Sequence, residues 1–275
     1  MATDLIAGTV EIRGTPIRYR EAGTGRPLLL VHGVTIDHRQ MVREWEPAFE
    51  GRTGWRRIYP DLPGRGETPA ADWITSQDDM LRVTLEFLEA VAPGERFAVG
   101  GSSWGGYIAL GVVHERMADV DGAAFVVSNP LREGRTVPEG RQLVRDEQLA
   151  GSLAEGEREW FEGAVVATAE TLAAYREVLA PALAAADVDF IERVEEHTTF
   201  SFDVQDLPEP FDRPSLFVSA RQDTMAGYAD VLTLIESFPR ATFAILDRAG
   251  HGVGTDQPVL FQALVREWLD RMETG

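Results

Sequence analysis

Apolar residues gather along this chain in short runs, with longer helical patterns between them. Residues 7–22 predict two short strands joined by a turn at Arg13-Gly14-Thr15. The run from Pro27 to Val31 is continuously apolar, as is typical of a strand buried on both faces. Five later runs are also strand-like: Trp55–Tyr59, Phe97–Gly100, Ala123–Ser128, Ser215–Ser219 and Thr242–Leu246. Together, these segments predict eight strands.

Helical periodicity separates most of these strands. Ser76 is placed to cap a helix that runs to about Val91. Its apolar residues Leu81, Leu85 and Leu88 fall on one face. Further helices are expected at Arg39–Glu50, Trp104–Met117, Tyr228–Phe238 and Pro258–Met272. Strands that alternate with helices imply right-handed crossovers, so we expect an α/β fold with a mostly parallel eight-stranded sheet and helices on both faces.

The pattern changes between residues 131 and 212. This stretch has no convincing buried strand and predicts several short helices rich in Ala and Glu. It carries nineteen acidic residues and seven arginines, which supply −12 of the net charge of −19. We therefore expect a core of residues 1–130 and 213–275, with a helical cap of residues 131–212 inserted after the sixth strand. Such a cap would lie at the carboxyl edge of the sheet, where open α/β sheets bind their ligands.

Composition narrows the partners and the chemistry. Every basic residue among the 275 is arginine, and the acidic balance should repel nucleic acid and anionic membrane surfaces. The charge is typical of a soluble surface, with attraction of a cationic substrate as the alternative, and composition does not decide between them. The chain has no cysteine, which excludes disulfides, thiolate metal sites and cysteine nucleophiles. A small-molecule substrate is the expected partner, and the oligomeric state is left open.

The chain carries no sign of a membrane or secretory segment. No apolar run approaches the ~18 residues that predict a membrane-spanning helix. The start, Met1-Ala2-Thr3-Asp4, lacks the basic and apolar regions of a secretory signal. A cytoplasmic location is therefore expected.

The strongest local signal is Gly101-Ser102-Ser103-Trp104-Gly105, which has the form G-x-S-x-G between a strand and a helix. A sharp turn there lifts the nucleophile out of the sheet edge, and small residues two positions before and after it avoid a backbone clash. Ser103 is flanked in this way by Gly101 and Gly105, whereas Ser102 would be flanked by the bulky Trp104. Ser103 is thus the candidate nucleophile.

A serine hydroxyl is a weak nucleophile and needs an adjacent base. His251 lies in a Gly-rich loop just after the last predicted strand, where it can reach the serine turn. The third member should be a buried carboxylate that orients the imidazole. Asp223 follows the preceding strand and is the candidate, with an N-cap role near Met225 as the alternative.

Other positions for the acid are poorer. The end of the sixth strand, another common place for it, offers Ser128 and Asn129, and neither is acidic. Asp247 ends a strand, and Asp256 is placed as the N-cap of the last helix. Three other histidines are expected to be surface or packing residues: His38, His114 and His197.

The order Ser, Asp, His resembles that of the α/β-hydrolase superfamily. Val31-His32-Gly33-Val34 is similar to that family's HGx oxyanion loop, and Asp61-Leu62-Pro63-Gly64-Arg65-Gly66 to its D-x-P-G-x-G turn. The resemblance covers nearly the whole chain outside the cap. It implies a capped serine hydrolase whose oxyanion hole consists of the backbone N–H groups of Val34 and Trp104. It also implies a structural role for His32.

The resemblance implies an enzyme that cleaves a small or medium carboxylic ester through an acyl-enzyme, without cofactor or metal. One alternative is a C–C bond hydrolase of the same fold, which would suit the elbow glycine Gly106 and would need an arginine in its pocket. The candidates in the cap are Arg132, Arg135, Arg141, Arg145, Arg158, Arg176 and Arg193. Another is a weakly active protein that binds a ligand. The cap aromatics line an acyl pocket or form the cap's own core: Trp160, Phe161, Tyr175, Phe190, Phe200 and Phe202.

Overall fold

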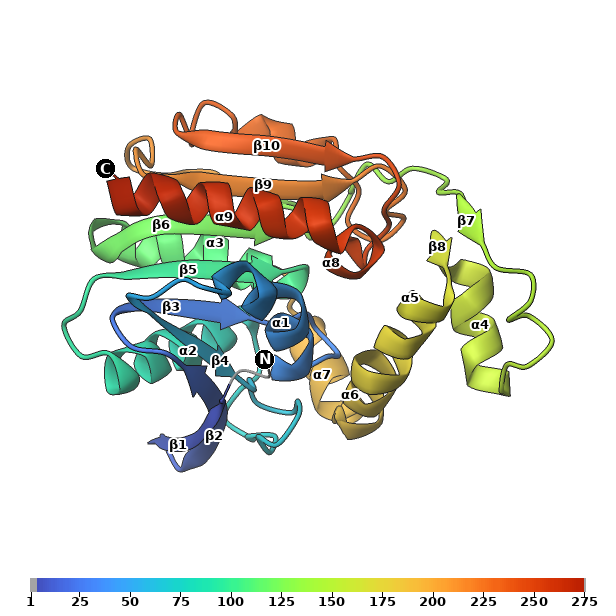
Figure 1. Ribbon diagram of the computed structural model, residues 1–275. Coiled ribbons are helices and arrows are strands. Elements are labelled where there is room, and N and C mark those ends of the chain that lie inside the picture. The colour runs from blue at the N-terminus through green and yellow to red at the C-terminus, as the bar shows by residue number, and fades with distance from the viewer. Residues whose placement is uncertain (1–3, 275) are drawn as a thin grey trace.

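The structure, a computed structural model, describes residues 4–274 and contains an eight-stranded sheet (Figure 1). Residues 1–3, used in the argument about a secretory signal, lie outside the described residues. The sheet order is β1-β2-β4-β3-β5-β6-β9-β10. The strands are β1 (Ile6–Ile12), β2 (Thr15–Ala22), β3 (Arg26–Val31), β4 (Trp55–Pro60), β5 (Phe97–Ser102), β6 (Val120–Val126), β9 (Ser215–Ala220) and β10 (Ala241–Leu246). All neighbours from β4 to β10 pair in parallel, while β2 pairs antiparallel with β1 and β4.

Helices cover both faces of this sheet (Figure 1). One face carries α2 (Gln77–Val91) and α3 (Trp104–Arg116), and the other carries α1 (His38–Trp45) and α9 (Pro258–Thr274). On β3, Leu29 and Val31 belong to the apolar core beneath α2 and α3. Leu28 and Leu30 belong to the core beneath α1 and α9, because successive strand residues point to opposite faces. The predicted α/β fold class is confirmed.

Two predicted helices differ from the structure. The pattern from Arg39 forms α1 and then a 3₁₀ turn, η1 (Glu46–Phe49), because Pro47 has no N–H with which to continue the α-helical bonding. The predicted helix Tyr228–Phe238 is wrong apart from the 3₁₀ segment η4 (Asp230–Leu234). There the Asp230 carboxylate accepts hydrogen bonds from the side chain of Asn129 and from the backbone amide of Thr136, both in the segment after β6. These tertiary bonds outweigh the weak local helix preference.

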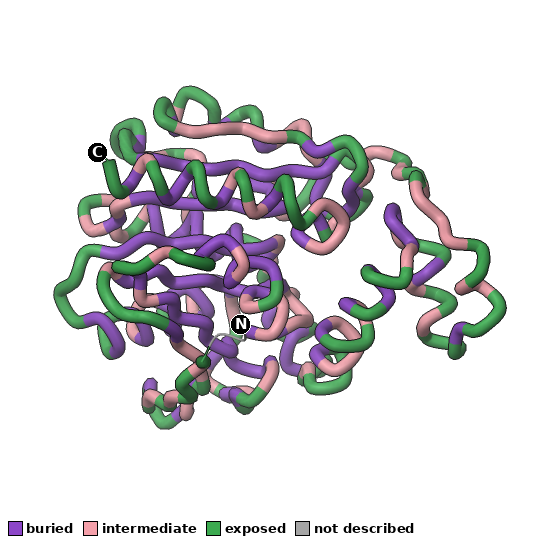
Figure 2. The backbone as a smooth tube through the Cα atoms, in the orientation of Figure 1, coloured by how far each residue is buried: buried purple, intermediate pink, exposed green. Residues whose placement is uncertain are grey.

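The segment between β6 and β9 (the insertion, residues 127–214) contains several short helices, as predicted, and also a small strand pair that the sequence did not indicate. Its elements are β7 (Val144–Arg145), α4 (Glu155–Gly163), β8 (Val166–Ala167), α5 (Ala169–Ala174), the π-helical η3 (Tyr175–Leu179), α6 (Ala180–Ala185) and α7 (Val188–Glu195). Figure 1 shows α4, β7 and β8 projecting to one side of the sheet, with α7 close to it. The backbone of the projecting part is less buried than the sheet (Figure 2).

The aromatic residues of the insertion divide between two cores. Phe161 packs with Trp160 and Tyr175 in a small cluster of the insertion itself. Phe190 and Phe200 are instead buried in the main core, on the α2 and α3 side of the sheet. The helix α7 is therefore held by the core of the sheet, while α4 and α5 have their own.

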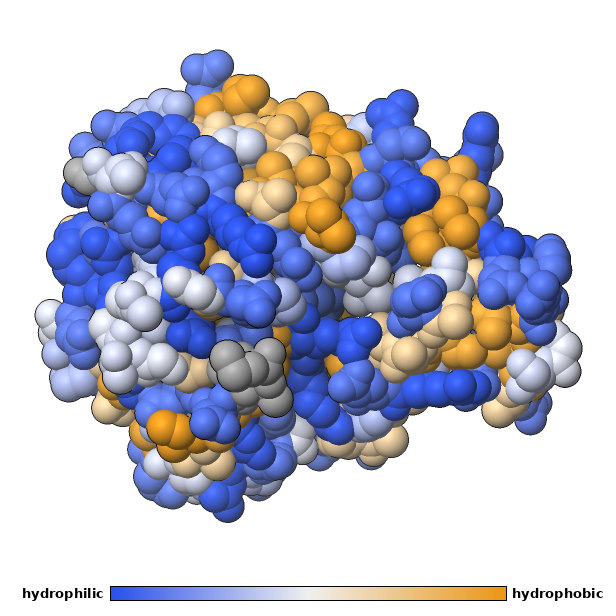
Figure 3. All heavy atoms as spheres, in the orientation of Figure 1, coloured by the Kyte–Doolittle hydropathy of each residue, from blue (hydrophilic) through white to orange (hydrophobic). Residues whose placement is uncertain are grey.

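Hydrophilic side chains cover most of the face seen in Figure 3, with apolar areas over β10 and over the insertion. Within residues 4–274, no helix combines the length and the apolar character needed to cross a membrane.

Candidate active site

Ser103 occupies a strained turn between β5 and α3. Its backbone has φ +56° and ψ −120°, a region that L-residues rarely adopt. A Cβ atom on Gly101 would lie 2.1 Å from the Gly105 carbonyl oxygen, and one on Gly105 would lie 2.2 Å from the Val31 carbonyl oxygen. Ser102 is the last residue of the strand and is buried, whereas Ser103 is partly exposed. The glycine spacing is therefore a steric requirement of the turn that presents Ser103.

The structure brings Ser103, His251 and Asp223 into one hydrogen-bonded chain. His251 Nε2 lies 2.8 Å from Ser103 Oγ. On the other side of the ring, His251 Nδ1 lies 2.9 Å and 3.1 Å from the two carboxylate oxygens of Asp223. The Asp223 side chain is fully buried, and the His251 side chain is 26% exposed. This geometry suits a serine that transfers its proton to an imidazole oriented by a carboxylate.

The three residues meet because each follows the carboxyl end of a parallel strand. Ser103 follows β5, Asp223 follows β9 and His251 follows β10. Asp223 Oδ1 also accepts hydrogen bonds from the amides of Met225 and Ala226, at 2.9 Å and 3.0 Å. The carboxylate thus caps a local turn and faces the imidazole at once, so the two sequence interpretations of Asp223 are compatible.

Asp256 supports the loop that carries His251. Its carboxylate accepts a hydrogen bond of 2.8 Å from the Gly250 amide, and burial raises its pKa to about 6. The expectation that Asp256 caps the last helix is wrong: it ends the short helix α8 (Val253–Asp256), and α9 begins two residues later. The histidine loop is held from behind by this carboxylate, a contact that the sequence pattern did not reveal.

Glu44 of α1 is buried against α8. A Cβ atom on Gly254 would lie 2.6 Å from Glu44 Cδ. Burial raises the pKa of Glu44 from 4.5 to about 7. Because the pKa of Glu44 is higher in the folded state, the native protein binds more protons than the unfolded chain between about pH 4.5 and pH 7. The free energy of unfolding should therefore fall as the pH rises through this range.

We expect Glu44→Gln to raise the free energy of unfolding at about pH 8 by on the order of 2–3 kcal/mol, because the variant buries no charge. The advantage should shrink toward zero near about pH 5, where wild-type Glu44 is protonated. Urea denaturation at both pH values measures this difference. The exposed Glu50→Gln serves as a control and should change stability by less than about 0.5 kcal/mol. An equal effect of Glu44→Gln at both pH values would contradict a buried charge.

The loop after β3 passes beside the serine. A Cβ atom on Gly33 would lie 3.6 Å from Ser103 Cβ. Among residues 4–274, neither the Val34 amide nor the Trp104 amide donates a hydrogen bond to another protein group. Both amides therefore lack a protein acceptor, and the oxyanion hole that the resemblance implied stays a prediction.

His32 anchors this loop in its neutral form. Its side chain is fully buried, its Nε2 accepts from the Leu62 amide at 3.0 Å, and its Nδ1 lies 2.7 Å from the Gly33 carbonyl oxygen. Burial lowers the pKa of His32 to about 4. A neutral imidazole that bridges two backbone groups has the structural position that the resemblance implied.

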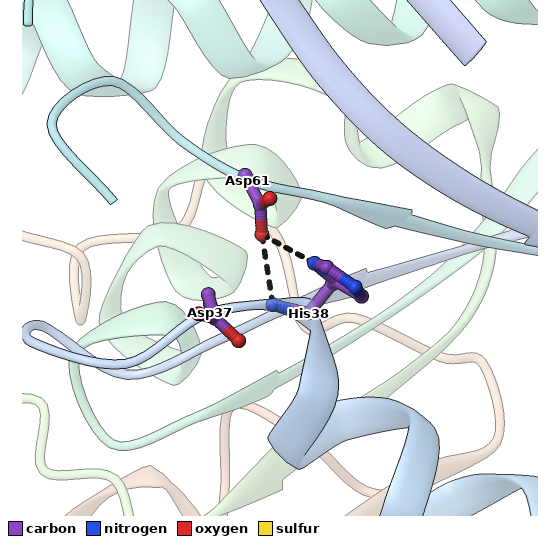
Figure 4. A group of neighbouring side chains, drawn as sticks. All are labelled: Asp37, His38 and Asp61. Carbon is purple, nitrogen blue, oxygen red and sulfur yellow. Dashed lines mark hydrogen bonds and ion pairs between the residues drawn. The ribbon is translucent and has the colours of Figure 1, made fainter. Parts of the chain in front are cut away.

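A second histidine ties the same loop to the turn after β4 (Figure 4). His38 donates from its backbone N and lies with Nδ1 at 2.8 Å from the same oxygen of Asp61. Burial raises the pKa of Asp61, but the hydrogen bonds and charge of His38 outweigh it and hold that pKa below its ordinary value. The sequence predicts His38 at the surface or in packing, and the structure places it in packing, buried and hydrogen-bonded. Its partner Asp61 is distant in sequence, so the bond itself could not be predicted.

Asp37 completes a cluster with the spacing of metal ligands, since ligand atoms of Asp37, His38 and Asp61 lie within 4.8 Å of one another. Asp37 instead caps α1 through the Arg39 amide and pairs with the Arg39 guanidinium. The second oxygen of Asp61 accepts from the Glu67 amide at 3.0 Å. Each carboxylate already accepts hydrogen bonds from protein groups. We therefore infer that the cluster holds the loop after β3 in place and is not a metal site.

Curated relatives match part of the chain. A 2-hydroxy-6-oxo-6-(2'-aminophenyl)hexa-2,4-dienoic acid hydrolase of Metapseudomonas resinovorans is 29% identical over 114 residues, which is 38% of this chain and 36% of the relative. A pimeloyl-[acyl-carrier protein] methyl ester esterase of Legionella pneumophila (strain Paris) is 30% identical over 115 residues, or 42% and 43% of the two chains. Each match thus spans less than half of the relative's own length.

The fold is matched over nearly the whole chain. An alpha/beta superfamily hydrolase from Oenococcus oeni PSU-1 superposes with a TM-score of 0.88 at 22% identity, covering 97% of this chain and 99% of that one. The family model described as "Alpha/beta hydrolase family" matches residues 28–263, from β3 into α9. This protein is therefore a hydrolase that belongs to the alpha/beta hydrolase family.

Proposed function

We propose that the protein is a serine hydrolase that cleaves a small or medium carboxylic ester through an acyl-enzyme. The observation that carries this proposal is the series of hydrogen bonds from Asp223 through His251 to Ser103, with 2.8 Å between His251 Nε2 and Ser103 Oγ. The serine end of the chain is partly exposed and the carboxylate end is buried. Such an arrangement activates the hydroxyl where a substrate can reach it.

In the first step, Ser103 Oγ bonds to the ester carbonyl carbon while its proton passes to His251 Nε2. The carbonyl oxygen takes the negative charge and accepts hydrogen bonds from the amides of Val34 and Trp104. Asp223 stabilises the imidazolium that forms. When the C–O bond to the alcohol breaks, His251 returns the proton to the leaving oxygen, and an acyl group remains on Ser103.

In the second step, His251 takes a proton from water as that water attacks the acyl carbon. The tetrahedral oxyanion again rests on the two amides. Collapse breaks the bond to Ser103 Oγ, which regains its proton from His251, and the carboxylic acid leaves. Protein groups and water suffice for both steps.

Residues 131–212 act in this proposal as a cap on a core of residues 1–130 and 213–275. Two contacts support this function. The Phe190 ring of α7 lies against the turn after β4, where a Cβ atom on Gly64 would approach it to 2.3 Å. Val165 lies against the histidine loop, where a Cβ atom on Gly250 would approach its Cγ2 to 2.7 Å. The insertion therefore contacts both the histidine loop and the turn after β4.

A second candidate is a hydrolase of a ketone substrate, in which Ser103 attacks a ketone carbonyl and a C–C bond breaks. The relative from Metapseudomonas resinovorans supports it, because its name describes the hydrolysis of an oxo-dienoic acid. Parallel assays with p-nitrophenyl acetate and an oxo-dienoic acid distinguish the two candidates. A cytoplasmic location and the absence of nucleic-acid or membrane partners stay predictions.

Treatment of the native protein with a fluorophosphonate probe tests the serine hydrolase proposal. We expect one adduct by intact mass, located on Ser103 and absent from Ser102 by peptide fragmentation. Heat-unfolded protein is the control and should remain unlabelled, because activation depends on the fold. A native protein with neither an adduct nor ester turnover would overturn the proposal. Stabilisation by ligands without turnover would then favour the ligand-binding alternative.

A further inference from the structure

Arg65 is a buried cation beside the candidate oxyanion hole. It lies in the turn after β4 and is only 1% exposed. Its Nε donates a hydrogen bond of 2.7 Å to the carbonyl oxygen of Val34, and its Nη1 donates one of 2.6 Å to the carbonyl oxygen of Pro63. Within residues 4–274, its buried Nη2 has no hydrogen-bond partner. The guanidinium is therefore directed at the backbone of the loop that carries one of the two free amides.

The same guanidinium packs against the residue that carries the other free amide. Its Cζ lies 4.6 Å from the centre of the Trp104 ring and 5.8 Å from that of Phe190. The N–H group of the Trp104 indole donates a hydrogen bond of 2.7 Å to Gln77 Oε1. Gln77 in turn donates to Glu195 of α7 at 2.8 Å. The Trp104 side chain is thus fixed both at its face and at its N–H group.

No carboxylate within the described residues forms an ion pair with Arg65. Of the acidic groups that act on it at longer range, Glu195 already forms an ion pair with Arg132, and Asp187 caps α7. Burial lowers the pKa of Arg65 to about 9, which leaves it protonated at neutral pH. Burying a charge without a direct counter-ion is costly, and such groups cluster at functional sites.

We propose that Arg65 is a positioning residue for the oxyanion hole, which holds the Val34 and Trp104 amides and adds a fixed positive charge beside them. The inference rests on the proposed function, because it concerns the charge that forms in acyl transfer. The hydrogen bond to the Val34 carbonyl fixes the peptide unit that follows Val34 and so restricts movement of the loop segment that carries its N–H. Since Arg65 is buried away from bulk solvent, its charge acts on a nearby oxyanion with little screening.

The alternative is that Arg65 only joins α7 to the turn after β4 and has no effect on the reaction. Both roles predict that replacing Arg65 makes the protein less stable, so stability alone does not distinguish them. They differ in how strongly the rate should depend on the atom that carries the negative charge in the transition state, oxygen or sulfur. Sulfur accepts hydrogen bonds more weakly than oxygen, so a thionoester draws less on the oxyanion hole than the corresponding ester.

The experiment compares Arg65→Met, Arg65→Lys and wild type on a p-nitrophenyl ester and on its thionoester. Rates are expressed per active site titrated with the fluorophosphonate, which removes any unfolded fraction. Arg266→Met is the matched control, because Arg266 also donates through Nε and one Nη to two backbone carbonyls, those of Ala48 and Pro47, away from Ser103.

We expect Arg65→Met to lower kcat for the ester by about 10²-fold, with KM changed by less than about threefold. The ratio of ester to thionoester kcat should fall by about tenfold. Arg65→Lys should recover part of the loss because it keeps the charge, and Arg266→Met should match wild type. If Arg65→Met does not fold, the kcat ratio of Arg65→Lys decides the question.

An unchanged ester to thionoester ratio in folded Arg65 variants would overturn the inference and leave a structural role for Arg65. That outcome differs from failure of the proposed function, in which wild-type protein itself neither labels at Ser103 nor turns over the ester.

Discussion

Replacing Ser103 by alanine is expected to lower kcat for ester hydrolysis by about 10⁵- to 10⁶-fold, close to the loss expected when the whole triad is removed. The reason is that Ser103 Oγ is the atom that forms the bond to the acyl group, and His251 has no other hydroxyl at 2.8 Å from its Nε2 in the described part of the chain. Residual rate over water would come from substrate binding and the two free amides. Steady-state kinetics with p-nitrophenyl acetate measures the loss.

Ser102→Ala is the matched control for this variant. Ser102 is the neighbouring residue and is buried at the end of β5, and the hydroxyl bonded to His251 Nε2 is that of Ser103. Its kcat should stay within about threefold of wild type. Because removing one hydroxyl at the surface of the turn changes little packing, Ser103→Ala should also keep the melting temperature of wild type. A Ser103→Ala variant that retains substantial turnover would rule out Ser103 as the nucleophile.

Replacing Asp223 by asparagine is expected to lower kcat by about 10⁴-fold. The amide keeps the shape of the side chain, and its oxygen can still accept from the amides of Met225 and Ala226. Its NH₂ group would then face His251 Nδ1, which favours the tautomer that carries its proton on Nε2. In that tautomer the histidine cannot accept the Ser103 proton. Fluorophosphonate labelling should slow in parallel with kcat.

Asp247→Asn provides the comparison for Asp223→Asn. Asp247 lies nearer to His251 in sequence, but it is exposed after β10 and its side chain takes no part in the triad. Its kcat should match that of wild type within about twofold. If Asp247→Asn and Asp223→Asn lowered kcat equally, the assignment of the acid would fail.

Much of the candidate site follows from local features of the sequence. An apolar run followed by Gly-x-Ser-x-Gly predicts a strand, a sharp turn and a helix, because the positive φ of Ser103 requires glycine at the two positions where a Cβ atom would meet backbone. Parallel strands end at one edge of the sheet, so residues placed just after β5, β9 and β10 were expected to meet. Local sterics and strand order need no knowledge of the final packing.

Local preference failed where long-range contacts outweigh it. The helical pattern from Tyr228 to Phe238 forms only a 3₁₀ segment, because Asp230 bonds to groups near residues 129 and 136. Asp256 has the side chain of an N-cap but binds the Gly250 amide behind the histidine. In each case a carboxylate has two possible partners, one local and one distant, and the tertiary fold decides between them.

The α/β fold class, the short helices between β6 and β9, and the placement of Ser103, Asp223 and His251 after strands of one sheet all follow from local sequence patterns. Only the tertiary structure placed Glu44 beneath α8, His38 on Asp61 and Arg65 against Val34 and Trp104. The physical reason is one of range. Periodicity and backbone sterics act over a few residues and can be recognised in a sequence, whereas buried charges meet partners chosen by the packing of distant elements.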